Sequence, residues 1–129
     1  MIVVDTSVWI NKLRDIETAA SRKLDSIANT REIIVGDVIL LEVLQGARSD
    51  ESAARMERLL KRFTVKPMLS EHLAIKAAGS YRHLRQRGIT IRSSIDLVIA
   101  TFCIEWGHAL LQDDRDFLPM TEHLGLQLA

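Results

Sequence analysis

The sequence predicts an α/β domain with a small, mainly parallel sheet of four to five strands and helices on both faces. Short apolar runs such as Ile2–Val4 and residues 33–35 have the length and the β-branched residues of buried strands. Longer segments with helical periodicity alternate with these runs, as crossover helices do in parallel sheets. The 129 residues, of which 47% are hydrophobic and 26% charged, fit one domain spanning residues 1–129.

Capping and turn residues separate the elements in the first half of the chain. Residues 5–7 (Asp-Thr-Ser) favour a helix start directly after the first strand, and Gly36 ends the second strand. Asp37 is predicted to cap the next helix, which ends at Gly46. The predicted elements are a strand at 2–4, helices at 8–13 and 18–28, a strand at 33–35, and helices at 37–46 and 52–63.

Proline and glycine separate the elements of the second half in the same way. Pro67 closes a short third strand, whereas Gly88 and Gly107 each follow a helical pattern. Residues 112–116 read as a polar loop after the fourth strand. The predicted elements are a strand at 64–65, helices at 70–87 and 93–106, a strand at 109–111 and a weak fifth strand at 127–128.

Composition excludes several function classes. The net charge is +0, from 17 basic and 17 acidic residues, which argues against a protein that coats nucleic acid by bulk electrostatics. Aromatic residues make up 5%, too few for a base-stacking platform. The single cysteine, Cys103, excludes an internal disulfide, fits a reducing compartment and lies in an apolar run that predicts burial.

No segment has the character of a membrane span or a secretion signal. A span needs roughly 18 consecutive apolar residues, and no stretch approaches that length. The first apolar run lacks a basic leader and ends at Asp5. We therefore expect a cytoplasmic protein with no membrane partner.

Carboxylates occur within or beside apolar segments. Asp5 follows the apolar residues 1–4, and Glu42 and Asp96 lie in otherwise apolar helical patterns. Taking an ionised carboxylate out of water is costly unless something pairs with it. An acidic loop containing Asp114 and Asp116 follows the fourth strand, and ligands of parallel sheets bind outside the carboxyl ends of the strands. Asp5 and this loop are therefore predicted to lie on the same edge of the sheet.

Each acid also has a purely structural explanation. Asp5 suits a helix cap, and Asp96 fits a capping box with Ser93. Glu42 could lie on an exposed helix edge, and turn chemistry alone could explain the acids of the loop. Together, however, like charges about 4 Å apart repel by around 4 kcal/mol per pair at an effective dielectric of 20. A converging set therefore requires a cation, and ligands that are all oxygen favour Mg²⁺ or Mn²⁺ over Zn²⁺.

The order of these motifs resembles that of a PIN domain. The chain opens with residues 1–7 (MIVVDTS), has Glu42 in its third helix, and continues with residues 93–100 (SSIDLVIA) and 110–117 (LLQDDRDF). The size and spacing resemble the VapC-type toxins of bacterial toxin–antitoxin modules over essentially the whole chain. No single motif is specific, but four in this order make a strong signal.

The resemblance implies a Rossmann-like fold and an endoribonuclease that depends on Mg²⁺ or Mn²⁺. It further implies a type II toxin that cleaves tRNA or rRNA, is held inactive by a cognate protein antitoxin, and forms a homodimer. The implied metal ligands are the acidic quartet, with Asp116 as the auxiliary acid and either Thr6 or Ser7 as the hydroxyl that orients the first aspartate. The quartet consists of Asp5, Glu42, Asp96 and Asp114.

The resemblance assigns the acids of the quartet different tasks. Asp5, Asp96 and Asp114 would bind the metal, and Glu42 would bind a second ion or position the attacking water. One departure from the family pattern is Gln112, which stands where threonine or serine is frequent and leaves a supporting contact in doubt.

Two other features have open alternatives. Arg82, Arg85 and Arg92 belong to the most basic stretch and would either bind an RNA backbone or form a solvated face. An apolar stripe is most simply core, with an antitoxin or dimer surface as the alternative. The stripe consists of Met56, Leu59, Leu60 and Phe63.

Two rival functions remain. A haloacid-dehalogenase-type phosphatase would need a second acid two residues after Asp5, where Ser7 stands, and a receiver would need an aspartate after the third strand and a lysine after the fifth, neither of which is visible. A non-catalytic interaction module with an unused acidic pocket is the other rival.

Overall fold

The computed structural model describes residues 1–28 and 32–129. Its sheet has the strand order β3-β2-β1-β4, and every pair is parallel. The strands are β1 (Ile2–Val4), β2 (Ile33–Gly36), β3 (Thr64–Lys66) and β4 (Ala109–Leu111). The predicted α/β class and parallel sheet are confirmed, whereas the weak fifth strand is reduced to one parallel bridge between Leu110 and Leu128.

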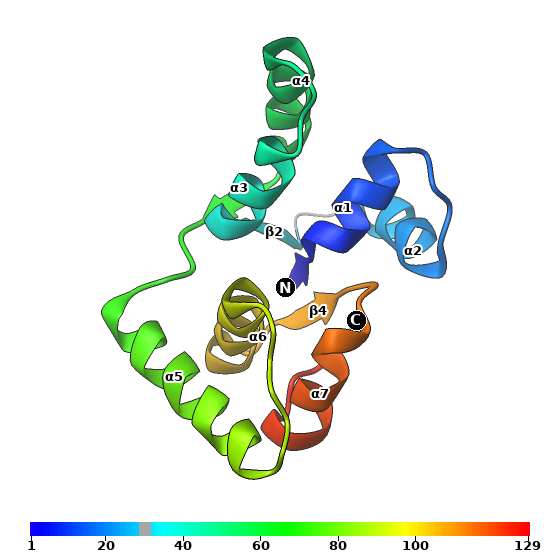
Figure 1. The fold of residues 1–129 in the computed structure, drawn as a ribbon. Coiled ribbons are helices and arrows are strands. Elements are labelled where there is room, and N and C mark those ends of the chain that lie inside the picture. The colour runs from blue at the N-terminus through cyan, green and yellow to red at the C-terminus, as the bar shows by residue number, and fades with distance from the viewer. Residues whose placement is uncertain (29–31) are drawn as a thin grey trace.

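Helices cover both faces of the sheet, as predicted (Figure 1). The first four helices lie on one side, with α4 projecting beyond α3, and α5 and α6 lie on the other. This division follows from right-handed crossovers, because the chain moves outward from β1 to β3 and then returns past β1 to β4. The helices are α1 (Thr6–Leu13), α2 (Ala19–Ile27), α3 (Asp37–Gln45), α4 (Asp50–Leu60), α5 (Glu71–Gln86), α6 (Ser94–Trp106) and α7 (Leu118–Leu124).

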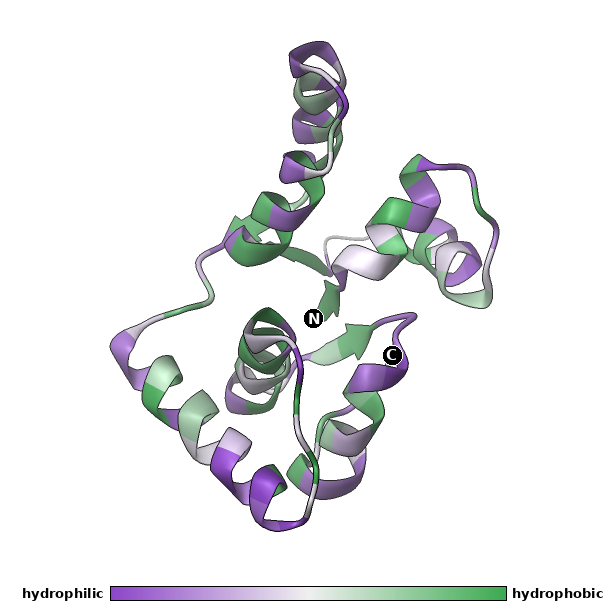
Figure 2. Cartoon of the chain, viewed as in Figure 1, coloured by the Kyte–Doolittle hydropathy of each residue, from purple (hydrophilic) through white to green (hydrophobic). Residues whose placement is uncertain are grey.

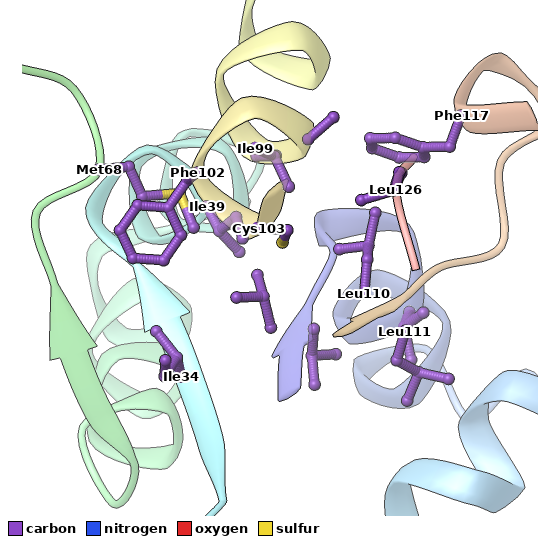
Figure 3. Packing of buried hydrophobic residues seen from close by; sticks show 14 of the residues in the cluster. Ile34, Ile39, Met68, Ile99, Phe102, Cys103, Leu110, Leu111, Phe117 and Leu126 are labelled. Carbon is purple, nitrogen blue, oxygen red and sulfur yellow. The ribbon is translucent and has the colours of Figure 1, made fainter. Parts of the chain in front are cut away.

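The core lies between the sheet and these helices. Figure 3 shows Ile99, Phe102 and Cys103 of α6 among side chains of the strands, and Figure 2 shows the apolar colouring of α6 and the sheet. Cys103 is 1% exposed, as its apolar surroundings predict. The apolar stripe, whose last residue Phe63 lies beyond the end of α4, is only partly core. Leu60 is fully buried, whereas the other three stripe residues are partly buried.

Several predicted boundaries and caps were wrong. The fourth helix was predicted at 52–63 but begins at Asp50, because Ser49 caps it by accepting a hydrogen bond from the amide of Ser52. Asp37 is the first residue of α3 and not its cap. Its carboxylate instead accepts a hydrogen bond from the amide of Met68 at 3.0 Å, which joins the start of α3 to the segment after β3.

The region after β4 contains more structure than the predicted loop. A short 3₁₀ turn, η1 (Arg115–Phe117), leads directly into α7. Pro119 lies in the first turn of α7, where its missing N–H is tolerated, and Gly125 ends the helix with a φ of 78°. None of the described helices is long and apolar enough to cross a membrane.

Candidate metal centre

The centre lies where β1 and β4 run side by side. The register pairs Val4 with Leu111, so Asp5 and the acidic loop leave the sheet at the same edge. The amide of Asp5 also donates to the carbonyl of Leu111 at 2.9 Å. The chain builds outward from β1 in one direction and returns on its other side, so this edge is a topological switch point, where parallel sheets bind ligands.

Asp5 is buried and only partly satisfied. Its side chain is 3% exposed and caps α1, with Oδ2 accepting hydrogen bonds from the Ser7 amide at 3.0 Å and the Ser7 hydroxyl at 2.6 Å. Within the described residues, Oδ1 is buried without a hydrogen-bond partner. Burial raises the pKa of this carboxyl, the bonds from Ser7 oppose the rise, and the Glu42 charge adds to it.

Glu42 reaches the centre from α3. The hydroxyl of Thr6 donates to its Oε1 at 2.6 Å, across 36 residues of sequence. The two candidate hydroxyls of the opening motif therefore have different partners, since Ser7 bonds to Asp5 and Thr6 bonds to Glu42. The α1 N-terminus thus orients two acids of the quartet at once.

Asp96 lies in the first turn of α6 and is half-buried. Ser93 accepts a hydrogen bond from its amide at 3.2 Å, but among the described hydrogen bonds Asp96 does not return one to the Ser93 amide, so only half of the predicted capping box forms. Burial and the charges of Asp5 and Asp114, in that order, together with smaller contributions from other acids, raise its pKa to about 7. The carboxyl therefore faces like charges rather than a backbone donor.

Asp114 and Asp116 complete the group. Asp114 caps η1, where its Oδ1 accepts a hydrogen bond from the Asp116 amide at 2.9 Å. One oxygen from each of Asp96, Asp114 and Asp116 lies within 4.8 Å of the others. Asp116, expected as an auxiliary acid, belongs to this group of three. Asp5 and Glu42 lie outside the group, but their charges are close enough to raise the pKa of Asp96.

The predicted basic residues divide between two locations. Arg82 and Arg85 line an open groove of about 510 Å³ between α5 and α6, and the Arg85 guanidinium lies 5.6 Å from the ring centre of Tyr81. Figure 2 shows hydrophilic residues gathered at the C-terminal end of α5, where Arg82 and Arg85 lie. Arg92 is exposed in the segment before α6 and does not line this groove.

A divalent cation fits this arrangement. Among the described residues, no lysine, arginine or histidine forms a salt bridge with any of the five acids. The Oδ1 atom of Asp5 has no hydrogen-bond partner among the described residues, and the raised pKa of Asp96 shows that its ionised form lacks a compensating positive charge. Oxygen donors at this density suit Mg²⁺ or Mn²⁺, since each hard cation prefers carboxylates and water.

Comparison with known proteins agrees with this geometry. The sequence model of the PIN domain matches residues 2–121. The chain belongs to the PIN domain family. Ribonuclease VapC11 from Mycobacterium tuberculosis is 35% identical over 135 residues, which cover 100% of this PIN domain chain and 98% of the relative.

Solved structures share the PIN domain fold. VapBC2 from Rickettsia felis, bound to a DNA fragment from its promoter, aligns with a TM-score of 0.77 at 20% identity, covering 100% of this chain and 98% of the other. A toxin–antitoxin complex from Klebsiella pneumoniae aligns with a TM-score of 0.70 at 15% identity, covering 91% of this chain and 90% of the other. At these identities the likeness is one of fold.

Sequence reasoning missed the supporting residue Asn11 and left the contact made by Gln112 in doubt. Asn11 donates from Nδ2 to Oδ2 of Asp113 at 3.1 Å, and the oxygen of the Gln112 side chain accepts from the Asp114 amide at 2.5 Å. Asn11 lies 102 residues from Asp113, so no local pattern signals their pairing. For Gln112 the signal was its departure from the family pattern.

Proposed function

We propose that this chain is an endoribonuclease that depends on Mg²⁺ or Mn²⁺ and acts as the toxin of a type II toxin–antitoxin module. The observation that carries the proposal is the convergence of Asp96, Asp114 and Asp116 within 4.8 Å, with the orphaned Asp5 oxygen beside them. The full-length similarity to Ribonuclease VapC11 supports RNA as the substrate class. We expect tRNA or rRNA to be the RNA that is cut.

The acids would have distinct tasks in this reaction. Asp5, Asp96 and Asp114 would hold the cation, with Asp116 close enough to contribute. The bound cation supplies activation of water and stabilisation of the leaving oxygen. The hydrogen bond from Thr6 holds the Glu42 carboxylate. From there Glu42 would bind a second ion or position the attacking water. Hydrolysis would leave a 5′-phosphate and a 3′-hydroxyl.

The proposal is tested with total cellular RNA. Incubation with the protein and Mg²⁺ or Mn²⁺ is expected to produce a small number of new 5′-phosphate ends at defined positions, and an excess of chelator should abolish them. The ends are mapped by ligating an adaptor to 5′-phosphates and sequencing. A non-catalytic module would leave the RNA intact with either metal, and that result would refute the proposed activity.

Arg82 and Arg85 are proposed to bind RNA phosphates, with Arg92 as a more distant contributor. Both arginines are exposed on the groove between α5 and α6, and α6 also carries Asp96. Guanidinium groups suit phosphate oxygens through paired N–H donors. In the cleavage assay this role would appear as a rise in KM with added salt.

A cognate antitoxin is the proposed protein partner, together with a second copy of this chain in a homodimer. The Klebsiella pneumoniae structure is a toxin–antitoxin complex, which supports the first partner. A mostly apolar cleft of about 70 Å³ lies between α1, α3 and α4, beside the partly buried Met56. Its lining residues are Ile10, Leu13, Arg14, Val43, Gly46 and Met56. We also propose a cytoplasmic location, since the single unbridged Cys103 fits a reducing compartment.

The cleft makes the antitoxin proposal testable. Met56→Lys places a charge on the cleft and is expected to weaken antitoxin binding at least about tenfold, since a buried unpaired charge is costly. RNA cleavage should stay within about threefold of the parent. Ile75→Lys, on the exposed face of α5, is the control for an apolar-to-charged change. Equal affinity of the Met56 variant and the parent would place the antitoxin elsewhere.

A further inference from the structure

The short segment between β4 and η1 determines where Asp114 lies. At its start, the carbonyl of Leu111 accepts the Asp5 amide, and at its end Asp114 caps the 3₁₀ turn. Only Gln112 and Asp113 intervene. Because the Asp114 carboxylate lies near the Asp96 carboxylate, repulsion favours outward movement of this segment when no cation is bound.

Gln112 makes a hydrogen bond inside this segment. Its half-buried side chain folds back, and the amide oxygen accepts a hydrogen bond from the Asp114 N–H at 2.5 Å. Aspartate, asparagine, serine and threonine commonly make this bond to the backbone two residues ahead. Gln112, which stands where the family often has threonine or serine, makes the same kind of bond through its longer side chain.

Helix α1 holds the same segment from outside. Ser7 Oγ accepts a hydrogen bond from the Asp113 amide at 3.1 Å while it donates to Asp5 at 2.6 Å. One turn further, Asn11 Nδ2 donates to Oδ2 of Asp113 at 3.1 Å. Ser7 and Asn11 are four residues apart and lie on the same face of α1. Together they form hydrogen bonds with both the backbone and the side chain of Asp113.

We propose that Gln112 and the Asn11–Asp113 pair are positioning residues that hold the Asp114 carboxylate in its metal-binding place. The proposal rests on the proposed function for its metal. These contacts act before the cation arrives, because they oppose the repulsion that would open the segment. Partners that orient metal ligands in this way typically change metal affinity 10- to 100-fold.

Direct Mn²⁺ binding tests the proposal without relying on activity. The free Mn²⁺ signal is followed by electron paramagnetic resonance during titration of the metal-free protein. Gln112→Ala is expected to raise the Kd about tenfold or more, Gln112→Thr to restore it to within about threefold, and Asn11→Ala to raise it about fivefold. At saturating Mn²⁺, kcat for RNA cleavage should remain within about threefold of the parent.

Controls separate positioning from general damage. Gln86→Ala removes an exposed glutamine at the end of α5 and should leave the Kd unchanged. Unfolding temperatures in chelator should agree among the variants to within about 3 °C. Parent-like Kd values for both Gln112→Ala and Asn11→Ala would overturn the proposal, as would a weakened Gln112→Ala that threonine does not restore. If the parent binds Mn²⁺ but cuts no RNA, the proposed function fails and the comparison of Kd values still stands.

Discussion

The double variant Asp5→Asn, Asp96→Asn is expected to lose RNA cleavage by at least about 1,000-fold while remaining folded. Each change removes a charge from the centre, and the loss should exceed the 10- to 100-fold effect of residues that only support a metal ligand. Folding should survive because asparagine also caps helices, so position 5 can still accept the Ser7 amide. Ser93 still caps α6 independently of the side chain at position 96.

Initial cleavage rates at saturating Mn²⁺, measured beside thermal unfolding, check this expectation. Asp15→Asn is the matched control, since Asp15 is exposed and has a φ of 55° that asparagine tolerates. The control should cleave at the parental rate. If the double variant cleaves RNA at more than about one tenth of the parental rate, Asp5 and Asp96 are not catalytic residues.

Asp96→Asn alone is expected to stabilise the metal-free protein at pH 8. The folded protein raises the pKa of Asp96 from 3.8 to about 7, so folding favours its protonated form. The resulting stability is fully present below about pH 4 and is lost as the pH rises through 7. This rise in the pKa of Asp96 corresponds to at most about 4 kcal/mol in the free energy of unfolding. The value is an upper limit because water reaches this half-buried carboxyl.

Scanning fluorimetry in chelator at pH 5 and pH 8 measures this effect. The variant should unfold about 3–10 °C above the parent at pH 8, and the difference should shrink at pH 5. Saturating Mn²⁺ should narrow this difference in unfolding temperature, because binding at 100 times the Kd adds about 2.7 kcal/mol to the stability of the parent. A parent that is as stable as the variant in chelator at pH 8 would show that repulsion at Asp96 is negligible. If Mn²⁺ stabilises neither the parent nor the variant, the result favours a non-catalytic module with an unused acidic pocket.

The fold could largely be predicted because its signals are local. Ile2–Val4 and residues 33–35 are apolar and β-branched, and Gly88 and Gly107 end helices with φ values of 77° and 72°. Helix α7 was not among the predicted elements, although Pro119 is tolerated in its first turn. Met120 of this helix is fully buried by tertiary packing, which the seven residues of α7 do not reveal on their own.

The acids of the centre could be predicted, but their connections could not. Asp5 and Asp96 are conspicuous because Asp5 ends an apolar run and Asp96 lies within an otherwise apolar helical pattern. The bond from Thr6 to Glu42 spans 36 residues and depends on how α1 meets α3, which periodicity does not specify. The close approach of Asp116 likewise depends on η1, a turn that reads in sequence as an irregular loop.

The pairing of β1 with β4 joins the two ends of the chain. Asp5 lies in the first few residues, whereas Asp114 and Asp116 lie among the last sixteen. A fragment released early from synthesis, or clipped before β4, would keep Asp5, Glu42 and much of its hydrophobic surface yet lack the carboxylates that close the centre. For a chain proposed to be toxic to the cell that makes it, we expect such fragments to cut no RNA, because the centre forms only once β4 and the acidic residues after it are present.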